Sequence, residues 1–133
     1  MIRLPDKDSV YLDESVAGFT KQLAADGVVE RQVDLLLVGV AYAITERLDP
    51  METIHRHDLN RVAAMDPDVR LVLEASLVWY VRENNLSQPA TAKDLLDLLA
   101  RVGSAGIAKL RKESGALSLN QLRSRLVSLV SGN

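Results

Sequence analysis

The sequence of 133 residues contains no cysteine. This absence excludes disulfide bonds, thiolate-bound metals and cysteine nucleophiles from the chain. Aromatic residues are also few, with three tyrosines, one tryptophan and one phenylalanine, and only two histidines occur. The chain therefore has few aromatic rings on which the bases of a nucleic acid could stack.

Long apolar runs are missing as well. The longest, residues 35–44, has ten residues and includes Gly39, whereas a membrane-spanning helix needs about 20. The N-terminal stretch MIRLPDKDSVYLDES carries early charges and lacks the apolar core of a signal peptide. We therefore expect a cytoplasmic protein with no membrane contact.

Proline and glycine together supply only 11 residues, and helix signals recur along the whole chain. We expect an all-α fold, a compact bundle of six or seven helices around two central apolar helices at about 30–47 and 67–83. Residues 1–133 are predicted to form a single helical domain with a basic C-terminal helical pair at about 107–130. The predicted helices are about 14–25, 30–47, 59–65, 67–83, 92–102, 107–113 and 119–130.

Capping signals set most of these bounds, because a short oxygen-bearing side chain accepts hydrogen bonds from the first free N–H groups of a helix. The predicted N-caps are Asp13, Asp58, Asp66, Thr91 and Ser118. Residues 103–106 (GSAG) are predicted to break the helix that begins at residue 92, and Gly115 to end the next one. The apolar run 35–42 also fits a strand, but its length and charged flanks favour a helix.

The last predicted helix has an apolar stripe of its own. Arg123 and Arg125 lie off this stripe. The residues of the stripe follow helical spacing and are Leu119, Leu122, Leu126, Leu129 and Val130. The stripe packs onto the bundle or docks on another chain, and a homodimer through this helix is one form of such docking. Intramolecular packing is favoured, because terminal helices frequently close a core.

His55 and His57 form the only histidine pair, and Asp58 follows them. Imidazole and carboxylate groups bind transition metals, but residues two apart on a helix point to different faces. An extended segment is needed for both to reach one ion, and no further histidine or cysteine completes a site. A loop that leads into a helix is the favoured interpretation.

Two acidic residues lie inside the central apolar helices, Asp34 in the first and Glu74 in the second. Buried carboxylates can act as general acids or bases. Arg70 lies four residues before Glu74, so a structural ion pair is the favoured interpretation. A small enzyme that uses Asp34, Glu74 or the histidine segment is kept as a minor hypothesis. No cofactor is expected.

Charge is divided along the chain. Residues 1–99 carry 10 basic and 17 acidic side chains, and residues 100–133 carry six basic and one acidic. The candidate contact residues in this basic end are Lys109, Arg111, Lys112, Arg123 and Arg125. Such residues contact nucleic acid phosphates, an acidic protein partner, or the acidic body of the chain itself.

Three segments of the chain carry short motifs. Residues 33–44 (VDLLLVGVAYAI) are an apolar stretch, residues 59–69 (LNRVAAMDPDV) contain an acidic Asp-Pro step, and residues 100–110 (ARVGSAGIAKL) contain a Gly-Ile step. In this order they resemble the early apolar helix, the short helix and the late segment of small accessory proteins found with bacterial DNA phosphorothioation (Dnd) gene clusters. The resemblance covers roughly residues 14–113. It implies a non-enzymatic helical component of a DNA modification or restriction system and transfers no catalytic residue.

The leading hypothesis is therefore a non-enzymatic accessory or adaptor protein of a bacterial DNA modification or restriction (defence) system. It binds other macromolecules through its basic C-terminal helices. A protein partner or self-association is favoured. The alternative is a sequence-tolerant nucleic-acid-binding protein that acts through the same basic helices.

Overall fold

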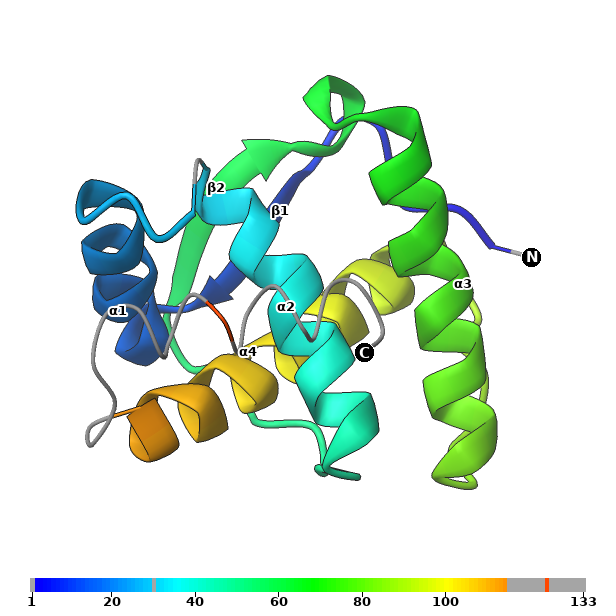
Figure 1. Cartoon of the computed structure of the whole chain (residues 1–133). Helices are drawn as coiled ribbons and strands as arrows, with labels where there is room; N and C mark the ends of the chain where they lie inside the picture. Colours follow the sequence, from blue (N-terminus) through cyan, green and yellow to red (C-terminus); the bar gives the residue numbers. More distant parts are fainter. Residues whose placement is uncertain (1, 30, 115–123, 125–133) are drawn as a thin grey trace.

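Four α-helices and one two-stranded antiparallel sheet make up the part of the chain that the structure describes (Figure 1). The structure is a computed structural model, and it describes residues 2–29, 31–114 and 124. The elements follow in the order β1 (Ser9–Asp13), α1 (Glu14–Ala25), α2 (Gln32–Thr45), β2 (Arg56–Arg61), a 3₁₀ turn (Val62–Ala64), α3 (Pro67–Glu83) and α4 (Ala92–Ser114).

The predicted all-α bundle of six or seven helices is wrong, because two segments are strands. β1 pairs with β2, and Tyr11 lies opposite Asp58, which is therefore a strand residue and not a helix cap. Val10 pairs with Asn60, so Leu59 is the extra residue of a β-bulge. Residues 10–13 are all buried. A strand that is buried on both faces lacks the alternating pattern by which a sequence reveals a strand.

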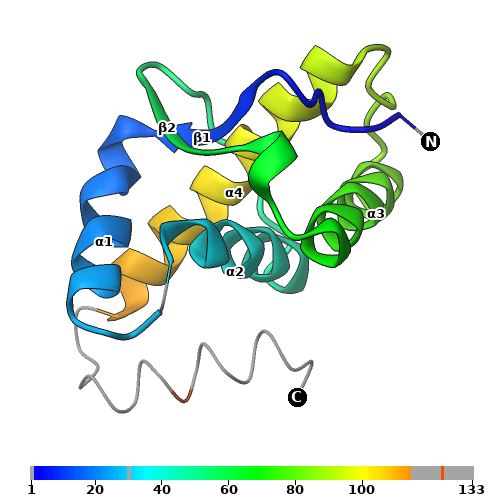
Figure 2. The ribbon, with the colours of Figure 1, turned by 90° about the horizontal axis from the view of Figure 1, so that it is seen from above.

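The predicted break at residues 103–106 is also wrong, since α4 continues from Ala92 to Ser114. Its two glycines serve close packing against α2. A Cβ atom on Gly106 would lie 1.7 Å from the carbonyl oxygen of Gly39, and one on Gly39 would lie 2.5 Å from that of Gly103. The helix backbones therefore touch where α2 crosses α4 (Figures 1 and 2). The first member of the predicted basic pair is the end of α4, and the second lies outside the described residues.

Several helix predictions are confirmed. α1 and α3 have the predicted bounds, and the side chains of Asp13 and Asp66 accept the capping hydrogen bonds. Thr91 Oγ1 accepts a hydrogen bond from the Asp94 N–H at the start of α4. α2 lies within the predicted 30–47, so the strand alternative for this run is wrong.

One apolar core joins all of these elements. α2 packs against α4, and β1 packs against α4 as well. α1 covers one end of this core, and α3 covers the other. Figures 1 and 2 both place α3 at an edge of the molecule. Its core-facing residues are Leu73, Glu74, Leu77, Tyr80 and Val81. α3 is thus a peripheral helix, although the sequence predicts a central one.

The carboxylate of Asp13 connects α1 to the loop before β2. Besides capping α1, it accepts hydrogen bonds from the N–H groups of Ile54 at 2.8 Å and His55 at 3.1 Å. The Asp13 N–H donates to Ser104 Oγ of α4 at 2.9 Å. Burial alone would raise the pKa of the Asp13 carboxyl, but hydrogen bonds from Ser15, His55 and Ile54 outweigh it and lower the pKa to about 2.

Replacing Gly106 by alanine should lower the free energy of unfolding by about 1–3 kcal/mol. The new Cβ would meet the backbone oxygen of Gly39, which cannot rotate away. Gly18 is the matched control, because no atom lies within 4 Å of a Cβ placed there, and alanine should stabilise its helix by about 0.5–1 kcal/mol. Urea denaturation measures both changes. Equal stability of the two variants would contradict the backbone contact.

The Asp13 hydrogen bonds predict a specific pH dependence. The folded-state pKa of about 2 lies below the unfolded value of 3.8, so the stabilisation is fully present above about pH 4 and is lost as the pH falls toward 2. The stabilisation amounts to about 2 kcal/mol. Wild type and Asp13→Asn should therefore differ most near pH 7 and least near pH 2.5 in urea denaturation. A difference that stays constant over this range would refute the assignment.

Candidate functional site

The structure describes three of the five candidate basic residues, Lys109, Arg111 and Lys112, while Arg123 and Arg125 lie outside the described residues. Lys109 Nζ lies 3.7 Å from the Glu113 carboxylate. Arg111 donates a hydrogen bond of 2.7 Å to the carbonyl oxygen of Ser15 and so ties the end of α4 to α1. Two of the three described cations therefore interact with groups of their own chain.

The histidine segment is extended, as a shared metal ion would require. His57 lies in β2 opposite Leu12, and the His55 backbone precedes the strand, where its N–H donates to Asp13. Among the described residues, however, no group of three or more His, Cys, Asp or Glu side chains is arranged to hold a metal ion. The segment therefore closes the sheet onto α1 and is not the candidate site.

Glu74 is fully buried, and the predicted ion pair with Arg70 is present at 3.6 Å. Two partners that the sequence did not reveal are closer: Arg3 Nε at 2.7 Å and the Leu4 N–H at 2.6 Å. The carboxylate thus fastens the N-terminal segment to α3. Asp34 is partly exposed and pairs with Arg31 at 3.1 Å at the start of α2. Both acidic residues have structural partners.

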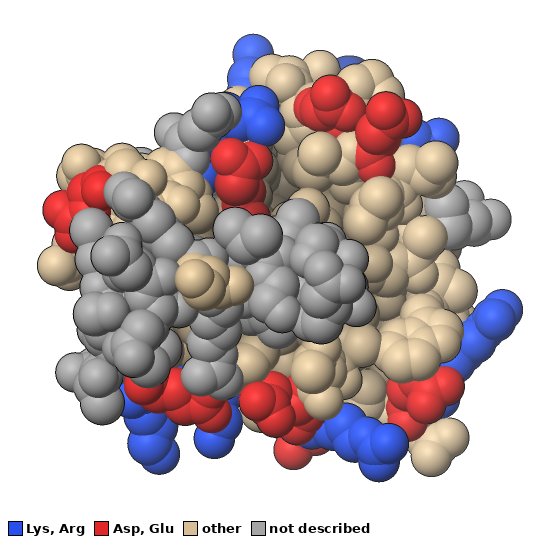
Figure 3. All heavy atoms as spheres, in the orientation of Figure 1, with Lys and Arg blue, Asp and Glu red and all other residues tan. Residues whose placement is uncertain are grey.

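A more distinctive feature is the side of α3 that faces away from the core. Leu71, Val72 and Trp79 are each 49% exposed, and Ala75 is exposed between them. Spacings of three and four residues place these four side chains on one helix face, which we call the α3 outer face. In Figure 3 the region over α3, at the right, is mostly uncharged.

Exposed apolar clusters of this kind mark interaction surfaces more often than single exposed residues do. Trp79 is the only tryptophan of the chain, and tryptophan is among the residues that contribute most to binding at protein interfaces. The sequence contained the signal, since α3 is apolar nearly all round. The sequence predicts a central helix here, but an apolar helix at the edge of a fold buries only one side.

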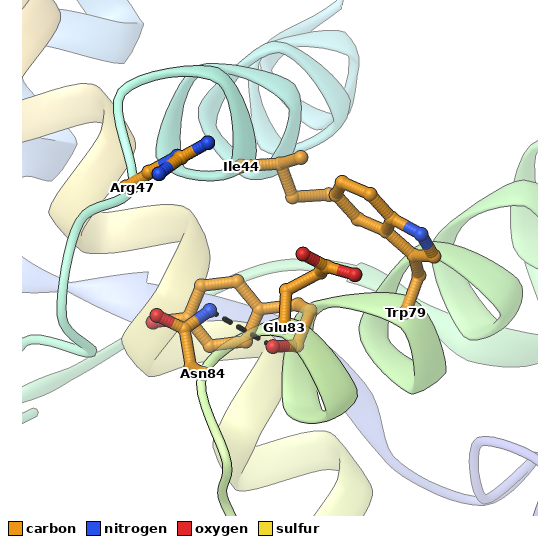
Figure 4. A pocket seen from close by; sticks show the side chains of 6 residues that line it. Ile44, Arg47, Trp79, Glu83 and Asn84 are labelled. Atoms are coloured by element: carbon orange, nitrogen blue, oxygen red, sulfur yellow. Dashed lines mark hydrogen bonds between the residues drawn. The ribbon is translucent and has the colours of Figure 1, made fainter.

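A small pocket of about 160 Å³ lies beside this face, between α2 and α3. The side chain of Ile44 points toward the Trp79 ring, and the Glu83 carboxylate points into the same space (Figure 4). Arg47 and Asn84 complete the rim with Tyr80. A space of this size holds about one benzene-sized group, so the pocket extends the α3 outer face by room for one side chain of a partner.

Tyr80 is a structural member of this pocket. Its hydroxyl donates to the Leu48 carbonyl oxygen at 2.6 Å. Burial, and to a smaller extent the charge of Asp49, raises the pKa of Tyr80 to about 12. The phenol therefore stays protonated at neutral pH and holds the end of α2 against α3.

A second, polar hollow of about 630 Å³ lies over β1 and α4, where the Tyr11 hydroxyl donates to the Asp97 carboxylate. Burial and the bond to Asp97 raise the Tyr11 pKa above its ordinary value. The Arg56 guanidinium lies 4.2 Å from the centre of the Tyr11 ring. These contacts connect the sheet to α4 and leave Tyr11 protonated, which argues for a structural role.

None of the described helices is both long enough and apolar enough to cross a membrane. Comparison with protein-family models, curated proteins and solved structures gives no match. The functional argument therefore depends on the surfaces of the molecule itself, and the α3 outer face is the strongest of them.

Proposed function

We propose that this chain is a non-enzymatic adaptor protein that binds another protein through the α3 outer face. One observation carries the proposal: three large apolar side chains, including the only tryptophan, are each half exposed on one face of a regular helix. Their positions are fixed, because the opposite face of α3 is anchored in the core by Leu73 and Leu77. A preformed helix face binds without the cost of ordering its backbone.

The energetics favour a moderate interaction. Complete burial of a large apolar side chain contributes about 1.5–3 kcal/mol, so covering the exposed halves of Leu71, Val72 and Trp79 contributes about 1 kcal/mol each. This gain is offset by the loss of translational and rotational freedom on association. Contacts around the four residues are therefore needed for a stable complex.

A role in a bacterial DNA modification or restriction system, and a cytoplasmic location, are further parts of the proposal. The role in DNA modification rests on the sequence resemblance of residues 14–113. A protein partner is favoured over nucleic acid, because Lys109 and Arg111 interact with groups of their own chain.

A photoreactive benzoylphenylalanine in place of Ala75 tests the surface in living cells. Because Ala75 lies at the centre of the α3 outer face, we expect a discrete cross-linked adduct after illumination, detected by gel mobility and mass spectrometry. The same probe at Ala63, an exposed residue of the 3₁₀ turn, is the control. If position 75 gives no more adduct than position 63, the proposed function is wrong.

A salt titration separates the nucleic-acid alternative. We expect no saturable binding of duplex DNA by the purified chain at micromolar concentration and 50 mM salt, measured by fluorescence anisotropy. Binding that falls steeply with salt and is weakened by Lys109→Glu and Arg111→Glu would instead favour phosphate contacts by the basic end. Lys21→Glu, an exposed residue of α1, serves as the control substitution.

A further inference from the structure

We propose that the partner at the α3 outer face is a second copy of this chain, packed antiparallel about a two-fold axis at Ala75. This inference rests on the proposed function, since it assumes that the face binds protein. In such a dimer the same surface of both copies takes part, so the face must be complementary to itself.

The residues around Ala75 meet this requirement in pairs. Leu71 and Trp79 each lie four residues from Ala75, and Val72 and Val78 each lie three. An antiparallel partner reverses the order along the helix axis. Each Trp79 therefore comes level with Leu71 and Val72 of the second copy, so that a large ring meets smaller aliphatic side chains.

The ends of the face are complementary in charge. Asp68 and Arg82 lie seven residues before and after Ala75, which places them about 10 Å from it in opposite directions along the helix. Both are exposed, and among the described residues neither side chain has an ion-pair partner. In the antiparallel dimer each Asp68 meets Arg82 of the second copy.

The same positions argue against a parallel pair. Parallel packing about Ala75 would place Asp68 against Asp68 and Arg82 against Arg82, and like charges repel. Residues 68, 75 and 82 lie seven positions apart, and so do residues 71 and 78. Contact residues recur at this spacing in helices that pack side by side at a small angle. The small side chain of Ala75 allows the two helix axes to approach closely.

The size of the face sets the expected affinity. Two helices that share one stripe bury less than the roughly 1,600 Å² of a standard interface. We therefore expect a dissociation constant on the order of tens of micromolar, with dimers dominant only at high protein concentration.

Charge exchange between two variants tests the arrangement. Asp68→Arg leaves two basic residues at the ends of the face, and Arg82→Asp leaves two acidic ones. In sedimentation equilibrium of the full chain from 5 to 500 µM, each variant alone should dimerise roughly tenfold more weakly than wild type. Their equimolar mixture should recover the wild-type affinity, because the basic face of one variant then meets the acidic face of the other. Circular dichroism checks that both variants are folded.

Two readouts assign the dimer to this face. The emission of Trp79, the only tryptophan, should shift to shorter wavelength as the protein concentration rises. The control Lys21→Glu, at an exposed position of α1 at the opposite end of the molecule, should dimerise as wild type does. A monomer at 500 µM, unchanged dimerisation of both charge variants, or a mixture that fails to recover affinity would overturn the inference.

The outcome also distinguishes this inference from the proposed function. If the purified chain is monomeric but the probe at Ala75 captures a different protein in cells, the second copy is excluded and the adaptor function stands. If the chain is monomeric and the probe captures nothing, both are wrong.

Discussion

The contact between the backbones of α2 and α4 determines how the rest of the molecule is arranged. Gly39, Gly103 and Gly106 let the two helices touch at a distance that no side chain would permit. Leu36 and Leu12 pack around Gly103, so the close crossing also fixes β1 against α4. Ser104, the neighbour of Gly103, accepts a hydrogen bond from the N–H of Asp13. Asp13 is the residue at which β1 ends and directly after which α1 begins. One short glycine-containing segment therefore positions the sheet and two helices.

This arrangement leaves α3 at the periphery. With α2 and α4 in direct contact, α3 can pack only along one side, where Leu73, Leu77 and Val81 enter the core. Glu74 adds an electrostatic anchor by holding Arg3 and the Leu4 N–H. An unpaired buried carboxylate would be costly, so these partners fix the rotation of α3 about its own axis. The same rotation directs Trp79 outward. The exposure of the α3 outer face is thus a consequence of how its opposite face is held.

The sequence predicted the elements that local signals control and missed those set by distant contacts. Asp13 and Asp66 cap helices through neighbouring N–H groups, so α1 and α3 were predicted with the correct bounds. β1 and β2 pair across more than 40 residues, and the burial of β1 on both faces hides its periodicity. Glycines at 103 and 106 weaken an isolated helix, yet here they permit its tightest contact. The candidate site was missed for a related reason: an apolar pattern identifies which residues avoid water but not which neighbour covers them.

The divided charge and the α3 outer face act over different distances. The excess of acidic residues in 1–99 and of basic residues in 100–133 influences approach and orientation, but salt screens it beyond about 8 Å. The apolar face acts only on contact and is nearly insensitive to salt, apart from the charges of Asp68 and Arg82 at its ends. Because these two charges are opposite, the net charge of the face is zero and its attraction to a second copy does not depend on the balance of the whole chain. The proposed self-association through α3 therefore depends on this contact surface and not on the charge imbalance of the whole chain.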